Sequence, residues 1–514
     1  MTPRWRTILF GVLLANAAGA APSNKTDVVR DLAGRVGPIV GSALACGDIA
    51  RPRIRVVVDK FAAVIKEASS NEAERDDLTQ LLDRNVADGR GAVTAGKIDC
   101  RLADRQLADL ERSLAAPTLA ATIAPSSAVA ATAPAAPAVS TTTSGVSDRE
   151  IRFGIAAPFS GAARELGRQM KLGIDTAFNR VNDAGGVEGR MLRLIAADDG
   201  YEPTRTADAM KQLYEKDQVF GIIGNVGTPT AVVAVPYALQ RRLLFFGAFT
   251  GANVLRNDPP DRYVFNYRPS YAEETDAAVR YLVKMRRLQP RQIAVFAQQD
   301  AYGDSGFAGV AKAFRTLGAS DSAILRLNYK RNTVDVEEAV NQLKVQKPLI
   351  KAVVMVSTYR AAAKFIEKTR DLYPGMIYTN VSFVGSTELA EELMLLGARY
   401  AKGVIVTQVV PAVSGYSSVV LEYKNALAKY FPGEAPDYVS LEGYVSANVL
   451  IQALKRAGPQ LDTEKLIDNL ESMRNLDLGL GTPLSFGRAE HQASHKIWGT
   501  ALDENGRFQP IELE

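Results

Sequence analysis

The stretch 219–250 constrains the fold of this chain more than any other segment. It reads VFGIIGNVGTPTAVVAVPYALQRRLLFFGAFT. The short, β-branched run Val219–Ile223 and the apolar run Leu243–Gly247 are typical of buried strands. Between them, Thr228 suits the N-cap of a helix and Pro229 its first turn, where the missing N–H of proline costs nothing. The stretch therefore predicts a strand, a loop, a helix and a second strand.

The two loops of this unit follow neighbouring strands, so both should border the crevice in which open parallel sheets bind ligands. A helix N-terminus capped by the Thr228 hydroxyl can hold a carboxylate through backbone N–H groups. Pro236 lies inside the predicted helix and is expected to kink or shorten it. Taken alone, the unit fits an ordinary capped helix between core strands better than it fits a binding site.

Strands and helices alternate from Glu150 onward, which extends the same pattern over most of the chain. The predicted strands read IRFGIAA, MLRLIAAD, the two described above, QIAVFAQ, AILRLNY, KAVVMVS, IYTNVSF and GVIVTQVV. Predicted helices cover residues 166–181, 307–317, 336–343, 361–372, 389–396, 419–430 and 441–457, and short strands follow near 496–502. Two consecutive series of this kind indicate an α/β fold with two parallel-sheet lobes.

Residues 1–20 predict a secretory signal peptide, because Arg4 and Arg6 precede an apolar run and the small residues Ala18-Gly19-Ala20. The 514 residues are too many for one core, so we expect two or three domains. The formal net charge of +4 at pH 7 gives no reason to expect nucleic acid as a partner. No later run of about 18 apolar residues occurs. We therefore expect a soluble protein outside the cytoplasm.

Two segments of different composition separate the signal peptide from the α/β region. Residues 21–115 predict a small all-α domain, because apolar residues recur at helical spacing. Helix starts are predicted at Pro52, Asn71 and Asp99. Residues 116–147 are rich in Ala, Pro, Thr and Ser, which favours a linker. The only cysteines, Cys46 and Cys100, favour a disulfide in an exported chain, with two buried thiols as the alternative.

Four phrases of the sequence resemble one known family. They are IRFGIAAPFSGAARELGRQMKLGIDTAFNRVNDAGGVEGRMLRLIAADD, GIIGNVGTPTAVVAVP, YGDSGFAGV and FVGSTELAEEL. Together they resemble the type I periplasmic solute-binding proteins, the group of the leucine/isoleucine/valine-binding protein. The resemblance covers about residues 148–514 and implies two lobes joined by three crossings, near Arg268, near Pro411 and before the last strands. Lobe 1 would comprise about 148–268 and 410–490, and lobe 2 about 269–409 and 491–514.

The resemblance implies a ligand site with residues from both lobes. Those of lobe 1 are Val226, Gly227, Thr228, Ala248, Phe249 and Thr250. The hydroxyls of Thr228 and Thr250 would bind the carboxylate of the ligand, and the Ala248 carbonyl would bind its ammonium. From lobe 2, Tyr302 would close over the ligand, and Tyr359 is a weaker match.

The family also has an acidic partner for the ammonium, which should follow the strand IYTNVSF. At that place this sequence has Gly385-Ser386-Thr387-Glu388. Thr387 and Glu388 are therefore the candidates, and the carboxylate is one position displaced or absent. This departure weakens the expectation of a standard α-amino acid as the ligand.

Two short motifs point to other chemistry. Gly303-Asp304-Ser305-Gly306 copies the nucleophile motif of chymotrypsin-like proteases, but the only histidines, His491 and His495, come far later in the chain. These histidines have the spacing of a helical zinc pair, yet no third ligand is evident. We therefore expect no enzymatic activity, no metal and no cofactor.

The resemblance implies a periplasmic binding protein that delivers a small polar solute, such as a branched-chain amino acid or an amide, to an inner-membrane ABC permease. We expect it to act as a monomer and to use its binding energy for lobe closure. A periplasmic ligand sensor that passes its signal to a protein partner remains the alternative, because the helical domain is not part of the resemblance.

Overall fold

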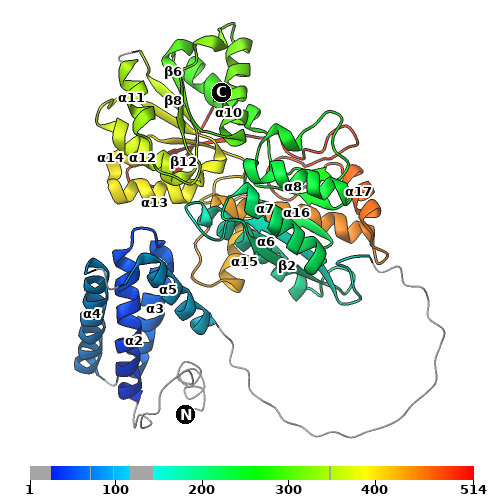
Figure 1. Ribbon diagram of the computed structural model, residues 1–514. Coiled ribbons are helices and arrows are strands. Elements are labelled where there is room, and N and C mark those ends of the chain that lie inside the picture. Colours follow the sequence, from blue (N-terminus) through cyan, green and yellow to red (C-terminus); the bar gives the residue numbers. More distant parts are fainter. Residues whose placement is uncertain (1–24, 70, 96–97, 116–142, 347–348, 514) are drawn as a thin grey trace, which may run out of the picture. The chain divides into compact units, whose positions relative to one another are not determined.

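The computed structural model describes residues 25–69, 71–95, 98–115, 143–346 and 349–513. The chain divides into two compact units, Met1–Ala136 and Pro137–Glu514 (Figure 1). The predicted signal peptide, and the predicted linker as far as residue 142, lie outside the described residues.

Helices make up the described part of the first unit. Their bounds are α2 (Lys25–Ala45), α3 (Arg51–Ala68), α4 (Glu72–Thr94) and α5 (Cys100–Ala115). The helices α3, α4 and α5 begin next to the predicted starts, and the Asn71 side chain accepts a hydrogen bond from the Glu74 N–H (2.9 Å). No separate helix start was predicted for α2, which contains Pro38. Val40, Val57 and Leu78 are among the buried side chains that give this unit a core of its own.

Cys46 and Cys100 form a disulfide within the helical unit, with their Cα atoms 5.5 Å apart. Cys46 follows the last residue of α2 and Cys100 is the first residue of α5, so the bond joins these two helices. Arg53 on α3 adds ion pairs with Asp104 and Glu111 on α5, each at 2.6 Å. The unit is therefore held by its own core and its own cross-link.

A parallel five-stranded sheet, ordered β2-β1-β3-β4-β5, forms the centre of the first lobe. The strands are β1 (Glu150–Ala157), β2 (Met191–Asp198), β3 (Gly221–Ile223), β4 (Leu244–Phe246) and β5 (Val264–Phe265), of which β5 was not predicted. The helices of this lobe are α6 (Arg164–Asp183), α7 (Pro203–Lys211), α8 (Thr228–Gln240), α15 (Ser418–Tyr430), α16 (Tyr438–Ala457) and α17 (Thr463–Glu471) (Figure 1). The helix α8 continues through Pro236, so this proline does not end it.

A seven-stranded sheet, ordered β12-β11-β10-β9-β8-β6-β7, forms the centre of the second lobe. The strands are β6 (Ile293–Gln298), β7 (Arg326–Tyr329), β8 (Ala352–Val356), β9 (Ile377–Asn380), β10 (Ile405–Gln408), β11 (Trp498–Leu502) and β12 (Phe508–Ile511). The strand β11 is antiparallel to both of its neighbours, β10 and β12, and all other neighbouring strands of this sheet are parallel. The helices are α9 (Tyr271–Arg280), α10 (Ala301–Thr316), α11 (Glu337–Val345), α12 (Tyr359–Arg370), α13 (Ser386–Leu396) and α14 (Ala398–Ala401). The predicted α/β class with two sheets is confirmed.

Two element boundaries of the second lobe differ from the prediction and move candidate residues. The strand predicted as IYTNVSF ends at Asn380, and a short 3-10 turn follows at Ser382–Val384. The helices α10 and α13 begin earlier than predicted, at Ala301 and Ser386. Consequently Tyr302, Thr387 and Glu388 lie in the first turns of helices rather than in loops.

The chain passes between the lobes after β5, after β10 and before β11, and these three crossings lie together. Asn266 pairs with Gln492 in a parallel bridge, which joins the first crossing to the third. The Tyr267 hydroxyl donates to the Val409 carbonyl (2.8 Å), which joins the first to the second. Side-by-side crossings of this kind form a hinge about which two lobes can close.

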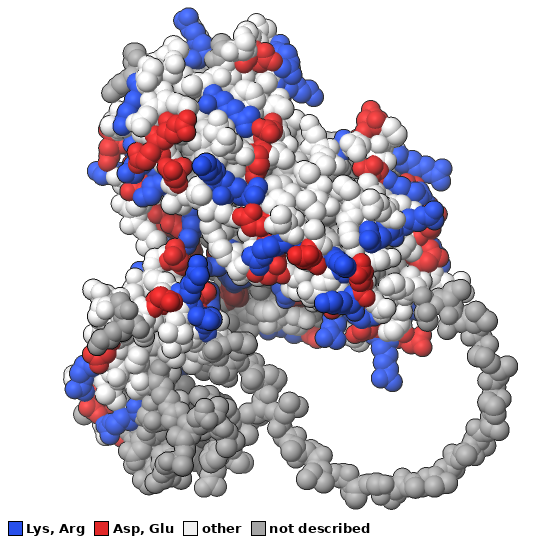
Figure 2. All heavy atoms as spheres, viewed as in Figure 1, with Lys and Arg blue, Asp and Glu red and all other residues white. Residues whose placement is uncertain are grey.

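No helix in the described ranges is both long enough and apolar enough to cross a membrane. On the face drawn in Figure 2, Lys and Arg side chains alternate with Asp and Glu side chains over both lobes. Because charges of both signs are mixed, no large patch of positive or negative electrostatic potential forms on that face.

Candidate functional site

The loops after β3 and β4 lie side by side at the carboxyl edge of the first sheet. The Phe249 N–H donates to the Asn225 carbonyl (2.7 Å), and the Gly227 N–H donates to the Phe249 carbonyl (3.2 Å). The hydroxyls of Thr228 and Thr250 lie 2.7 Å apart and share a hydrogen bond, and both side chains are buried. The structure therefore brings together two hydroxyls that the sequence assigned to separate loops.

The prediction that Thr228 caps α8 is wrong. The N-cap is Gly227, whose φ of 107° and ψ of 152° belong to a region that is essentially restricted to glycine. A Cβ at Gly227 would also collide with the ring of Tyr201. Because Thr228 is already the first residue of the helix, its hydroxyl does not serve the N–H groups of α8 and is directed to Thr250 instead.

Val226 and Ala248 support this pair of loops through their backbones. Val226 pairs with Phe249 in a parallel bridge. The Ala248 carbonyl accepts a hydrogen bond from the Thr250 N–H (2.9 Å). The carbonyl that the resemblance assigns to an ammonium is thus part of a tight turn within its own loop.

A cluster of aromatic rings, which we call the aromatic cluster, fills the junction between the lobes. It consists of Tyr201, Phe249, Tyr271, Tyr302 and Phe383. Phe249 from the first lobe and Phe383 from the second are stacked with their centroids 5.0 Å apart and an angle of 27°. The centroid of the Tyr302 ring lies 4.6 Å from that of Phe383 and 5.2 Å from that of Tyr271. All five side chains are buried.

Phe249 and Tyr302 are among the predicted site residues, whereas Phe383 is not. Residues 377–383 read as one β-branched and aromatic run, which predicts that Phe383 is part of a strand. In the structure it lies in the turn after β9. The signal that could have identified it is this position, because residues that follow parallel strands border the ligand crevice.

Tyr359 and Thr387 contact the first lobe at another part of the junction, where Glu388 is also buried. The Tyr359 hydroxyl donates to the Ala162 carbonyl (2.7 Å). Burial raises the pKa of Glu388 well above its usual range, and the Asp437 carboxylate at the start of α16 raises it further. Burial also raises the pKa of Asp437. The Thr387 hydroxyl donates a hydrogen bond to the Asp437 carboxylate, which opposes this rise. Tyr359 and Thr387 therefore join the lobes at Ala162 and Asp437, whereas the Oε2 atom of Glu388 has no hydrogen-bond partner.

Arg268, which the sequence analysis named only as a crossing, is a buried cation beside the aromatic cluster. Its side chain is 1% exposed, and it forms ion pairs with Glu274 (3.2 Å) and Glu442 (3.6 Å). Its Nη2 also donates to the Ser382 hydroxyl of the second lobe. The guanidinium carbon lies 4.9 Å from the centroid of the Phe249 ring, a distance that suits a cation–π contact. The sequence gives no signal for this role, because arginine in a loop is usually solvated.

Of the two carboxylates that pair with Arg268, Glu274 accepts the most hydrogen bonds. It accepts hydrogen bonds from the Ser382 N–H (2.7 Å), the Ser382 hydroxyl (3.0 Å) and the Thr407 hydroxyl (2.6 Å), besides the contact with Arg268.

Burial raises the pKa of Glu442 to about 7, although Arg268 opposes this shift. Burial likewise raises the pKa of Tyr271 to about 12, opposed by Arg268 and by the hydroxyls of Thr250 and Thr228.

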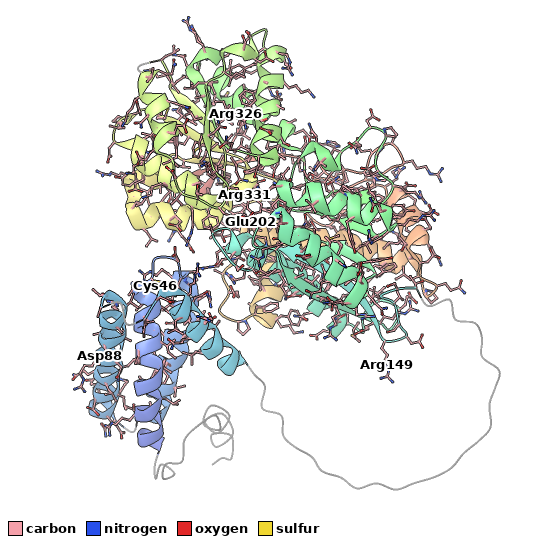
Figure 3. All side chains as sticks on the ribbon, in the orientation of Figure 1. Cys46, Asp88, Arg149, Glu202, Arg326 and Arg331 are labelled. Atoms are coloured by element: carbon pink, nitrogen blue, oxygen red, sulfur yellow. A yellow bond between two sulfur atoms is a disulfide. The ribbon has the colours of Figure 1, made fainter. Side chains whose placement is uncertain are left out.

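Polar contacts also join the lobes on their surface, and we call them the lobe latch. Arg331 pairs with Glu202 of the first lobe (3.0 Å) and with Asp300 of its own lobe (2.9 Å), and Figure 3 shows Arg331 beside Glu202. The Asn332 amide donates to the Glu202 carboxylate (2.6 Å). The structure is thus closed over the two threonines and the aromatic cluster.

The two motifs that pointed to other chemistry have structural roles. Ser305 lies inside α10, where its hydroxyl donates to the Ala301 carbonyl (2.8 Å). The ring of His491 stacks on Phe265 with centroids 3.8 Å apart. His495 forms a hydrogen bond with the Glu273 carboxylate (2.6 Å). Within the described residues, no group of three or more His, Cys, Asp or Glu side chains is arranged to hold a metal ion.

Comparison with known proteins agrees with this architecture. Residues 150–507 match the family described as "Periplasmic binding protein". The Leu/Ile/Val-binding protein homolog 3 of Brucella melitensis is 24% identical over 339 residues, which cover 65% of this chain and 86% of that protein. An amino acid binding protein of Pseudomonas aeruginosa is 22% identical, with coverages of 63% and 83%.

Solved structures share the fold. The crystal structure of a possible leucine/isoleucine/valine-binding protein from Rhodopirellula baltica is 38% identical, superposes with a TM-score of 0.68, and covers 73% of this chain and 98% of that one. A substrate-binding periplasmic protein from Ralstonia solanacearum is 26% identical, with a TM-score of 0.64 and coverages of 70% and 100%. The matched region is the two-lobed unit. The chain therefore belongs to the periplasmic binding protein family, in its type I group of leucine/isoleucine/valine-binding proteins.

Proposed function

We propose that this chain is the solute-binding protein of an ABC importer, which captures a small polar solute of the amino-acid or amide class between its lobes. In this function the protein is a monomer in the periplasm and delivers the solute to an inner-membrane permease. Residues 1–20 direct its export as a signal peptide and are then cleaved. The chain performs no chemistry on the solute. The binding energy favours the closed arrangement of the lobes over the open one.

One observation carries the proposal. The hydroxyls of Thr228 and Thr250 form a buried pair at the carboxyl edge of the first sheet, and residues of the second lobe cover the neighbouring Phe249. Hydroxyl groups beside the start of a helix are suited to an anionic group such as a carboxylate. The hinge and the lobe latch support reversible closure over this pair.

The helical unit supports the ligand sensor as a second candidate function. It has its own core and disulfide, and it lies outside residues 150–507, which match the family. A sensor would use the same closure but would signal through a protein that docks on the helices. Affinity capture from solubilised envelopes distinguishes the two functions, because an importer retains a permease and a sensor retains a receptor.

The proposal is tested with chain lacking residues 1–20 and purified without denaturant. Native mass spectrometry should detect a retained small molecule, and adding the identified compound at 100 times its Kd should stabilise the fold by about 2.7 kcal/mol. Ser305→Ala is the matched control, because this hydroxyl bonds within α10, and it should leave the binding unchanged. The proposal fails if no compound is retained and no amino acid, amide or organic acid raises the melting temperature.

A further inference from the structure

The aromatic cluster encloses polar atoms that lack partners. Arg268 is buried, yet its Nη1 has no hydrogen-bond partner, and its Nε contacts Glu442 only at 3.6 Å. The hydroxyl of Tyr271 makes no hydrogen bond of ordinary geometry either. The hydroxyls of Thr250 and Thr228 nevertheless lie close enough to Tyr271 to lower its pKa. The Tyr271 N–H donates to the carbonyl of Gly251, the residue after Thr250 (2.8 Å), and the guanidinium carbon of Arg268 lies 5.9 Å from the centroid of the Tyr271 ring. An N–H donor and several hydroxyls are thus carried by neighbouring side chains.

This set of donors is complementary to a carboxylate. A carboxylate only accepts hydrogen bonds, at about four lone-pair positions, and arginine binds it with good geometry. Arg268 is also charged at any physiological pH, because nearby carboxylates raise its pKa despite its burial. A carboxylate bound here would satisfy the Nη1 of Arg268 and the hydroxyl of Tyr271 together.

An ammonium group finds no such complement among the described acidic and carbonyl groups beside the aromatic cluster. Glu274 accepts from four donors, and Glu442 is already paired with Arg268. The Ala248 carbonyl is engaged in its own turn. Glu388, the acidic candidate after β9, lies in the first turn of α13 near Asp437, at the other part of the junction.

The rings define the shape of the ligand body. Phe249 and Phe383 come from opposite lobes and stack on each other across the junction. When the lobes open, these two rings separate. A flat apolar group inserted between them recovers ring contact on both of its faces as the lobes close.

We propose that the ligand is an aromatic carboxylate without an α-ammonium group, held by a site that Arg268 and Tyr271 complete. The carboxylate contacts these two side chains together with the threonine pair. The aromatic body lies between Phe249 and Phe383. This inference rests on the proposed function and narrows its solute class from amino acids in general to carboxylates.

Calorimetry with matched ligands tests the class. 3-Phenylpropionate and L-phenylalanine differ by the α-ammonium, and we expect the first to bind at least tenfold more tightly. Tighter binding of L-phenylalanine would overturn the inference while leaving the proposed function intact. Binding of neither, with another kind of molecule retained in native mass spectrometry, would do the same. Absence of any retained solute would instead overturn the proposed function.

A variant tests the residues. Tyr271→Phe removes only the hydroxyl, which makes no hydrogen bond of ordinary geometry in the structure. It should weaken the binding of 3-phenylpropionate about tenfold and bring the affinity for 3-phenylpropionate closer to that for the neutral 3-phenylpropanamide. Tyr423→Phe is the matched control, because this buried hydroxyl pairs with Ser440 outside the cluster (2.9 Å). It should leave the ratio of the two affinities unchanged. An unchanged ratio in Tyr271→Phe would show that the carboxylate binds elsewhere.

Discussion

Replacing Thr228 tests the threonine pair most directly, because its hydroxyl can be removed without touching a helix cap. If the ligand carries a carboxylate, Thr228→Ala removes one hydrogen bond to a charged group, which contributes about 1.5–3 kcal/mol. Since 1.4 kcal/mol corresponds to a factor of ten, affinity should fall by roughly one to two decades. The free energy of unfolding should also fall by about 2 kcal/mol, from the lost contact with Thr250 and from one buried methyl group.

Two further substitutions at the same position separate these effects. Thr228→Ser keeps the hydroxyl and removes the methyl group, so it should lower stability by about 0.8 kcal/mol and leave affinity nearly unchanged. Thr228→Val keeps the branched shape and removes the hydroxyl, so it should lose affinity as Thr228→Ala does. Thr250→Ala should behave like Thr228→Ala, and the double variant should lose less than the sum of the two because the hydroxyls bond to each other (2.7 Å).

The assays are isothermal titration calorimetry with the identified ligand and urea unfolding of the same samples. Affinity must be compared at a temperature where every variant is folded, so that stability does not enter the measured Kd. Full affinity in both Thr228→Val and Thr250→Ala would refute the reasoning and move the ligand away from this edge of the sheet. Additive losses in the double variant would show that the two hydroxyls act on different groups.

Three other measurements follow from the structure. Replacing Cys46 and Cys100 by Ser opens a loop with a sequence separation of 54 and should cost the helical unit about 4 kcal/mol in urea unfolding, with ligand affinity unchanged. The hydrogen bond with Glu273 raises the pKa of His495 above its usual value of 6.5. The stabilisation of the folded protein by this pair is therefore complete below pH 6.5 and is lost as the pH rises through the higher pKa of the folded state. His495→Gln should remove this pH dependence from the free energy of unfolding. Arg331→Ala removes a partly exposed ion pair and should weaken ligand affinity by less than about fivefold. Small-angle scattering of the ligand-free variant should show a larger fraction of molecules with open lobes.

The fold could be predicted from the sequence because its signals are local. A buried parallel strand is a short β-branched run, and a covering helix repeats its apolar residues at helical spacing, so the alternation from Glu150 predicted two sheets. The loops that carry Thr228 and Thr250 followed from the ends of two such strands. The errors occurred at boundaries, where 377–383 reads as one strand although it ends at Asn380.

The contacts across the lobes could not be predicted in the same way. Phe249 and Phe383 are stacked although they are far apart in the sequence, and Arg268 meets Glu442 from a helix that the chain reaches only after its second crossing. Periodicity indicates which face of an element is buried, but not which element of another lobe covers it.

The sequence alone therefore determined the alternating strands and helices, the separate helical segment and the two threonine loops, since each depends on residues close together in the chain. The tertiary structure decided that Gly227 rather than Thr228 caps α8. It also decided that Arg268, Tyr271 and Phe383 meet at the junction. The physical reason is that these contacts depend on how three adjacent crossings orient two rigid sheets, which no single stretch of sequence encodes.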